Sequence, residues 1–299
     1  MKQIVECVPN FSEGRDAAVI RDIADAVAAV SGVTVLDLTS DADHNRSVLT
    51  FVAEPEACRE GALALFAAAI PRIDLTRHRG QHPRLGAVDV VPFIPIRNVD
   101  TAACVALARD AGRRIAERFG VPVYLYEDAA SSEDRRNLSN IRKGEFEGFA
   151  DKMKLPEWKP DFGPAAPHPT AGATVVGSRM PLIAYNINLG TADPSIADRI
   201  ARSIRHVGGG FRYCKAMGVE LKDRGIVQVS INMTNYKKTP LFRVFECVKS
   251  EAARYGVDIV GSEIVGLTPA EALYEAAEFY LRIEKFSPNL VLETKLMDR

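Results

Sequence analysis

The order of apolar strands and amphipathic helices repeats along this chain, and the repetition narrows the possible folds more than any other feature. Up to residue 95, β-favouring runs and helical periodicities alternate as strand, helix, strand, strand, helix, strand. Past residue 180 the same order returns, without obvious repetition of the sequence itself. This order is the split βαβ arrangement, a mixed or antiparallel sheet backed by helices. We therefore expect an α/β (α+β) protein with two ferredoxin-like subdomains, residues 1–178 and 179–299, and a ligand site between them.

The segment between the two repeats has a different character. Residues 127–172 are rich in Arg, Asp and Glu and then in proline, which indicates a charged helical excursion followed by an extended linker. In the second repeat, Asp193 and Pro194 predict an N-cap and a first-turn proline. Thr268 and Glu271 have the spacing of a capping box in front of a final helix.

Composition excludes several classes of protein. With 38 basic and 39 acidic residues, the chain lacks the charge excess of a general nucleic-acid binder. No apolar run reaches the ~18 residues that span a bilayer, and the start lacks the apolar core of a signal peptide. The five cysteines are scattered among apolar neighbours, which indicates reduced thiols rather than a disulfide framework. We expect a cytoplasmic protein that does not bind membranes.

The stretch from Thr76 to Ile96 places a histidine just before a buried strand. It begins polar and basic, and it ends as an apolar, β-favouring run from Val88. His82 on such a loop is either a general acid or base near neutral pH or an ordinary loop histidine bonded to backbone. His78 lies four residues earlier, but Gly80 and Pro83 oppose a helix and no HExxH glutamate is present. We therefore expect no metal site here.

Three further polar stretches remain open between a functional and a structural reading. The turn at 41–46 is dense in Asp, His, Asn and Arg, as a binding site or a solvated turn would be. Glu263, at a strand end, either orients an imidazole or a substrate nitrogen or forms a surface pair. The proline-containing segment Gly163–Gly172 either walls a binding groove or joins the subdomains.

Several long motifs, in order along the chain, resemble the glutamate formimidoyltransferase family, which also forms part of the bifunctional formimidoyltransferase-cyclodeaminases. They are VECVPNFSEGR at 5–15, RGQHPRLGAVDVVPFIPI at 79–96, VPVYLYEDAA at 121–130, PDFGP at 160–164 and IVGSEIVGLTPAEAL at 259–273. The resemblance implies two α/β subdomains with a tunnel between them. It also implies transfer of the formimino group of N-formimino-L-glutamate to N5 of tetrahydrofolate, the co-substrate, without a metal.

The resemblance carries individual residues with it. The catalytic histidine of the family falls on His82. The folate-binding segment falls on Gly163, Pro164, Ala165, Ala166, Pro167, His168, Pro169, Thr170, Ala171 and Gly172. Glu263 stands where the bifunctional enzymes carry a glutamine, and Thr39 stands where they carry an acidic residue, with Asp41 nearby. Glu263 and Asp41 are therefore candidates to stabilise the reacting nitrogens, and Arg46, Arg84 and Arg179 are candidates to bind the glutamate carboxylates.

The chemistry of the transfer explains why one histidine can act both as the general base and as the general acid. N5 of the folate attacks the amidinium carbon, and the adduct must lose a proton from N5 while the glutamate nitrogen gains one.

The family implies a homodimer, and a chain that stops near Leu296 is expected to release its product to a separate cyclodeaminase. The alternatives are another donor (formiminoglycine, or 5-formyltetrahydrofolate with glutamate as acceptor), a non-catalytic folate-binding protein, and a metallohydrolase that uses His44, His78 and His82.

Overall fold

The computed structural model describes residues 2–297, and the chain forms two compact units. Unit 1 comprises Met1–Arg179 and unit 2 comprises Met180–Arg299. Each unit has its own sheet and its own hydrophobic core, and each is described by itself below. The predicted class, an α/β protein with two subdomains, is confirmed.

Unit 1 is built on the predicted strand and helix order. The elements are β1 (Ile4–Cys7), α1 (Ala17–Ala28), β3 (Thr34–Asp41), β4 (Arg46–Ala53), α2 (Pro55–Ala69) and β5 (Val88–Arg97). β1 pairs with β4 and β5, and β3 pairs with β4, all antiparallel, which gives the ferredoxin-like order β5-β1-β4-β3. A two-residue strand, β2 (Asn10–Phe11), continues β1 between the same two neighbouring strands.

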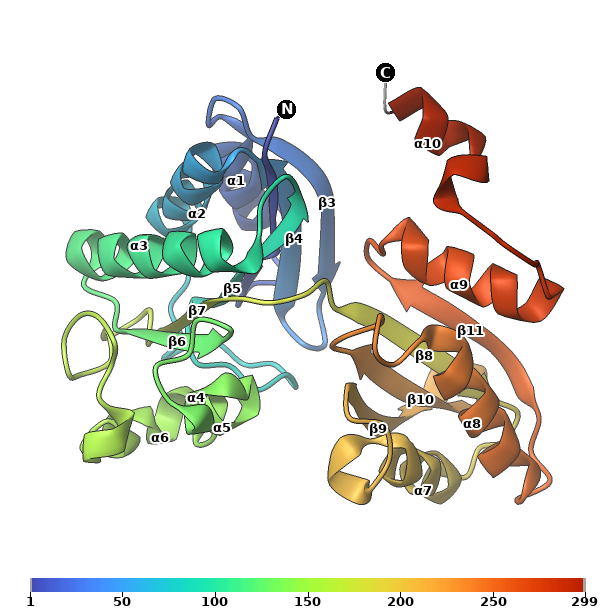
Figure 1. Ribbon diagram of the computed structural model, residues 1–299. Helices are drawn as coiled ribbons and strands as arrows, with labels where there is room; N and C mark the ends of the chain where they lie inside the picture. Colours follow the sequence, from blue (N-terminus) through green and yellow to red (C-terminus); the bar gives the residue numbers. More distant parts are fainter. Residues whose placement is uncertain (1, 298–299) are drawn as a thin grey trace. The chain divides into compact units, whose positions relative to one another are not determined.

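The sheet of unit 1 extends beyond this core. After α3 (Thr101–Phe119), β6 (Val123–Glu127) pairs in parallel with β7 (Thr174–Ser178), and β7 pairs in parallel with β5. β7 directly follows the predicted linker and was not predicted from the sequence. In Figure 1, α1, α2 and α3 lie side by side on one face of this sheet, and α4–α6 form a separate group. The inner face of α3 carries four fully buried residues, Cys104, Ala108, Ala111 and Ile115.

The excursion after β6 forms a small helical layer with its own core. It contains α4 (Glu133–Arg136), α5 (Leu138–Arg142), α6 (Glu145–Lys152) and the 3₁₀ turn η1 (Pro156–Trp158). Ile141 and Phe149 pack with Tyr124 in this core. Arg135, which is almost fully buried, donates to Asp161 Oδ2 at 2.8 Å and to the carbonyls of Glu157 and Lys159. These bonds fasten the end of the excursion to the sheet.

Unit 2 repeats the ferredoxin-like order without the extension. Its elements are β8 (Ile183–Leu189), α7 (Pro194–Ile204), η2 (His206–Gly208), β9 (Cys214–Leu221), η3 (Lys222–Arg224), β10 (Ile226–Met233), α8 (Leu241–Ala253) and β11 (Ile259–Val265). The strands are all antiparallel in the order β11-β8-β10-β9. Alternate residues of β8 and β10 pack on α7 and α8, because successive side chains of a strand point to opposite faces. α9 (Ala270–Leu281), η4 (Pro288–Leu290) and α10 (Leu292–Met297) follow.

The two predicted helix starts in unit 2 have different outcomes. Asp193 caps α7 as predicted, because its carboxylate accepts from the Ser195 N–H at 2.9 Å and Pro194 opens the helix. The capping box before α9 is wrong. Pro269 occupies the N-cap, and Glu271 instead accepts from Tyr236 Oη and pairs with Lys237. The Glu271 side chain therefore bonds to residues distant in the sequence instead of to the backbone N–H at the start of its own helix, as a capping box would require.

Two remaining expectations concern the cysteines and the membrane. All five cysteines are free thiols, and all are buried except the half-buried Cys247. Among the helices of residues 2–297, none is long and apolar enough to cross a membrane.

Candidate active site

The His82 loop is fastened to the turn between β3 and β4 by three hydrogen bonds. The Gln81 N–H donates to the Asp43 carbonyl at 3.0 Å, and the Asn45 side-chain amide donates to the Arg79 carbonyl at 3.0 Å. His78 Nε2 bonds to the Asn45 carbonyl at 2.8 Å. The two backbones approach so closely that a Cβ on Gly80 would lie 2.2 Å from the His44 carbonyl oxygen. Glycine is therefore required at this position, and the 41–46 turn holds the histidine loop in place.

His82 itself is a half-buried imidazole with one nitrogen committed and one available. Its Nδ1 lies 2.7 Å from the Pro83 carbonyl oxygen. A carbonyl can only accept, so Nδ1 carries the proton and Nε2 of the neutral ring keeps a free lone pair. Burial, followed by the charges of Arg46 and Arg142, lowers the pKa of His82 to about 4. Near neutral pH the ring is therefore neutral, and its Nε2 is able to accept a proton.

Those two arginines share one buried carboxylate. Asp89 is fully buried on β5, and its Oδ2 accepts from Arg46 Nη1 at 2.8 Å and from Arg142 Nη2 at 2.6 Å. Its Oδ1 accepts from the Leu85 N–H at 2.7 Å. Burial raises the pKa of Asp89, but the two guanidinium groups outweigh burial and hold it well below its usual range. Two cations against one anion leave a net positive charge beside His82.

A second histidine touches His82. His44 lies in the β3–β4 turn, and its ring centroid is 6.0 Å from that of His82, with the ring planes at 75°. Asp41 holds it, because His44 Nδ1 lies 2.8 Å from Asp41 Oδ2 and the His44 N–H donates to Asp41 Oδ1 at 2.8 Å. Burial raises the pKa of Asp41, but its hydrogen bonds with His44 bring it below the usual value.

The other two arginines singled out in the sequence have protein partners. Arg84 is buried, and its two Nη atoms bond to Glu147 at 2.9 and 2.6 Å, with Glu145 at 3.3 Å. These bonds tie the histidine loop to α6. Arg179, at the end of unit 1, lowers the pKa of Tyr126 by its charge and a hydrogen bond, although burial raises that pKa more, to about 12.

The segment Gly163–Gly172 is attached to the backbone on both sides of His82. The Ala87 N–H donates to the Ala171 carbonyl at 3.0 Å, and the Leu75 N–H donates to the Thr170 carbonyl at 2.8 Å. A Cβ on Gly172 would lie 2.2 Å from the Leu85 carbonyl oxygen, and its φ of +68° also favours glycine. His168 closes the loop, because its Nδ1 accepts from the Ala171 N–H at 3.0 Å. The segment is therefore a fixed wall next to the histidine loop.

Glu263 belongs to unit 2. It lies exposed on β11, where its Oε1 accepts from Gln228 Nε2 at 2.9 Å and from Asn186 Nδ2 at 3.2 Å. Gln228 also donates to Asn188 Oδ1 at 2.8 Å. These side chains occupy the face of the sheet opposite the α7–α8 layer, and they bond to one another across neighbouring strands.

The histidines of this region are not arranged as a metal centre. Within residues 2–297, no three His, Cys, Asp or Glu side chains form a group that could hold a metal ion. His78 donates from Nε2 to a carbonyl, and its Nδ1 is buried without a partner. Burial lowers the pKa of His78, which keeps the ring neutral. The loop from His78 to His82 is not helical, as predicted.

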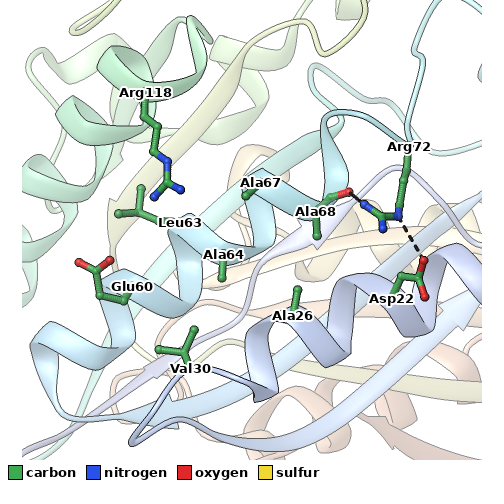
Figure 2. A pocket seen from close by; sticks show the side chains of 10 residues that line it. All are labelled: Asp22, Ala26, Val30, Glu60, Leu63, Ala64, Ala67, Ala68, Arg72 and Arg118. Atoms are coloured by element: carbon green, nitrogen blue, oxygen red, sulfur yellow. Dashed lines mark hydrogen bonds and ion pairs between the residues drawn. The ribbon is translucent and has the colours of Figure 1, made fainter.

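A hollow of about 610 Å³ lies elsewhere on unit 1. Figure 2 shows that it is lined by the small and apolar side chains of α1 and α2, with the Asp22–Arg72 ion pair at one side and Glu60 and Arg118 at the other. None of the predicted site residues lines it. Its walls carry no histidine, and its two carboxylates, Asp22 and Glu60, are paired with Arg72 and Arg59.

Sequence reasoning missed two members of the site, Asp89 and Arg142. The available signal was the single charged residue inside the apolar run from Val88 to Ile96, because a buried carboxylate requires a cationic partner. Arg142 carried no local signal, since it is one of many charges in the excursion.

Comparison with known proteins identifies the family of this chain. The N-terminal subdomain of the formiminotransferase domain matches residues 4–179, and the formiminotransferase domain matches residues 184–296. The chain belongs to the formiminotransferase family. The glutamate formimidoyltransferase of Streptococcus pyogenes is 49% identical, over 99% of this chain and 100% of that protein. The glutamate formimidoyltransferase of Thermoplasma acidophilum is 48% identical, over 98% of this chain and 97% of that protein.

Bifunctional relatives are also similar. The formimidoyltransferase-cyclodeaminase of Gallus gallus is 46% identical over 95% of this chain, and the match spans 54% of that protein. The formiminotransferase fold thus occurs both in proteins of about this length and joined to a cyclodeaminase.

Proposed function

We propose that this formiminotransferase transfers the formimino group of N-formimino-L-glutamate to N5 of tetrahydrofolate, giving 5-formiminotetrahydrofolate and L-glutamate. The near full-length similarity to two glutamate formimidoyltransferases supports the reaction. The observation that carries the mechanism is His82, a neutral imidazole with Nδ1 tied to a carbonyl and Nε2 free.

His82 acts as the base that takes the proton from N5. When N5 attacks the amidinium carbon it becomes a cationic ammonium, which is acidic enough to give its proton to a neutral imidazole. The resulting imidazolium stands beside Arg46 and Arg142, so it releases the proton readily. The same arginines keep the resting ring neutral, and each turnover therefore starts from the base form.

The net positive charge beside His82 also suits an anionic substrate. Arg46 and Arg142 already hold one carboxylate, that of Asp89, and guanidinium groups have donors left over for another. We assign the recognition of a glutamate carboxylate first to this pair. Arg84 and Arg179 remain weaker candidates; both Nη atoms of Arg84 are bound to Glu147.

Tetrahydrofolate is proposed to lie along the segment Gly163–Gly172, which is fixed to the backbone that carries His82. Orientation of the two substrates then supplies part of the acceleration, because the attack becomes effectively intramolecular. Glu263, on unit 2, is proposed to stabilise the cationic nitrogens of the adduct, since its carboxylate is exposed and available to a ligand. The chain is further proposed to act in the cytoplasm as a homodimer, with its product consumed by a cyclodeaminase on a separate chain.

A comparison of donors tests the reaction. Purified protein and tetrahydrofolate are mixed either with formiminoglutamate or with formiminoglycine. In a third assay the protein is mixed with 5-formyltetrahydrofolate and glutamate, with glutamate as the acceptor. We expect the folate absorbance to change fastest with formiminoglutamate, and added cyclodeaminase to convert the product further. A faster reaction with either alternative would change the assigned donor, and no reaction with any of them would indicate a folate-binding protein without catalysis.

A further inference from the structure

The contact between His44 and His82 places a second imidazole at the same site. The ring centroids are 6.0 Å apart, and the two loops that carry the rings are joined by backbone and amide hydrogen bonds. The side chain of His44 takes no part in those bonds, which use the Asn45 amide and the backbone. Its side chain bonds to Asp41 of the same turn, and its ring faces His82.

The hydrogen bond of His44 fixes which nitrogen is available. A carboxylate accepts only, so Nδ1 of His44 donates to Asp41 Oδ2 at 2.8 Å and Nε2 is left for an external partner. His82 has the same arrangement, with its Nδ1 tied to the Pro83 carbonyl. The difference lies in the partner. Nδ1 of His44 faces the carboxylate of Asp41, whereas His82 stands beside two arginines that oppose its protonation.

The proposed reaction needs one proton removed and another delivered. In the tetrahedral adduct, N5 of the folate and the departing glutamate nitrogen are bonded to the same carbon. N5 must lose its proton and the departing nitrogen must gain one before the bond breaks. Two neighbouring imidazoles, one bonded to a carboxylate and one beside two arginines, can divide these two tasks.

We propose that His44 is a second catalytic histidine, the general acid for the departing glutamate nitrogen, with Asp41 as the residue that positions it. This inference rests on the proposed function. His82 Nε2 accepts the proton of N5, and His44, as imidazolium, donates the proton on Nε2 to the glutamate nitrogen. The carbon–nitrogen bond to glutamate then breaks with its electron pair on that nitrogen, and the amidinium re-forms on N5. At the end His82 is protonated and His44 is neutral, and one proton passing from His82 to His44 through solvent restores the start.

The experiment compares leaving groups in three variants. His44→Ala, His82→Ala and Asp41→Asn are assayed with formiminoglutamate and with the formimino derivative of a weakly basic aromatic amine, which departs without a general acid. His44→Ala should lower kcat with formiminoglutamate by about 10²-fold but with the aromatic donor by less than about threefold. His82→Ala should lower both. Asp41→Asn keeps an acceptor for the His44 N–H and should lower kcat with formiminoglutamate about tenfold.

A second measurement is independent of the aromatic donor. Because His44 is about half exposed, added imidazole can reach the space left by His44→Ala, and it should restore part of kcat. The control is His206→Ala, an exposed histidine in η2 of unit 2, which should behave as the wild type. An equal loss with both donors, a loss of folate binding, no loss at all, or no rescue by imidazole would overturn the role of His44. Failure of the wild-type chain with formiminoglutamate would instead overturn the proposed function.

Discussion

The two units share one topology but treat polar groups in different ways. Each is a β-α-β-β-α-β unit with the same strand order, yet unit 1 buries Asp89 under two arginines beside a histidine, whereas unit 2 leaves Glu263 exposed among amides. The additional elements of unit 1, β6, β7 and α4–α6, account for the difference, because α5 supplies Arg142 and α6 supplies the partners of Arg84. The proposed base, His82, thus belongs to the extended unit, and the simpler unit carries an exposed polar face.

The largest expected effect is the loss of turnover in His82→Ala. Removing the base should lower kcat by about 10²–10⁴-fold, the usual contribution of general acid–base catalysis. Folate affinity, measured by fluorescence titration, should stay within about twofold, because the proposed folate wall is held by other residues. A parallel loss of folate affinity would mean that His82 is a structural residue.

The next prediction compares how much one carboxylate from each unit contributes to the free energy of unfolding. Asp89→Asn leaves two guanidinium groups beside a neutral amide in a buried site and should lower the free energy of unfolding by about 3 kcal/mol or more. Glu263→Gln, on the exposed face of unit 2, should change it by less than about 0.5 kcal/mol. Urea denaturation measures both, and hydrogen exchange of β5 and β10 amides assigns the loss to a unit. Equal effects would remove the distinction between the two units.

These two carboxylates also indicate how far the sequence could predict the molecule. The strand and helix order of both units could be predicted, because hydrophobic periodicity is a local property. β7 could not, since Thr174–Ser178 is short, follows a proline-rich run, and is stabilised by parallel neighbours distant in the sequence. His82 and the segment Gly163–Gly172 were identified by family motifs, and their roles stay predictions. Asp89 with Arg142, and His44 with His82, depend on tertiary contacts that no local pattern encodes.

A smaller effect concerns pH. Because the pKa of His82 is lowered to about 4, the ring is the neutral base at all higher pH, and the acid limb of kcat/KM should lie near pH 4 rather than near the ordinary ~6.5. The same shift contributes stability that is complete above pH ~6.5 and is lost as the pH falls towards 4, because the unfolded chain binds the proton first. Arg142→Gln removes one of the two positive charges that lower the pKa of His82, so the acid limb of kcat/KM should move to higher pH. An acid limb that stays in place would contradict the role of the arginines.

The smallest expected effect on turnover belongs to unit 2. Glu263→Gln introduces the glutamine that the resemblance places at this position in the bifunctional enzymes. The substitution removes a carboxylate charge that is exposed to solvent. We expect kcat to fall by no more than about tenfold, because exposed charges are screened. Steady-state kinetics with formiminoglutamate measures this effect. A loss as large as that of His82→Ala would move the centre of the chemistry towards unit 2.

The most direct test of the account follows the transferred group itself. Protein, tetrahydrofolate and formiminoglutamate carrying a ¹³C label on the formimino carbon are mixed, and the label is followed by NMR over a single turnover. The account predicts that the label moves from the glutamate nitrogen to N5 of the folate with the wild-type chain, and that it stays on the donor over the same time with His82→Ala. A label that remains on the donor with the wild-type chain, or that moves at the wild-type rate without His82, would contradict it.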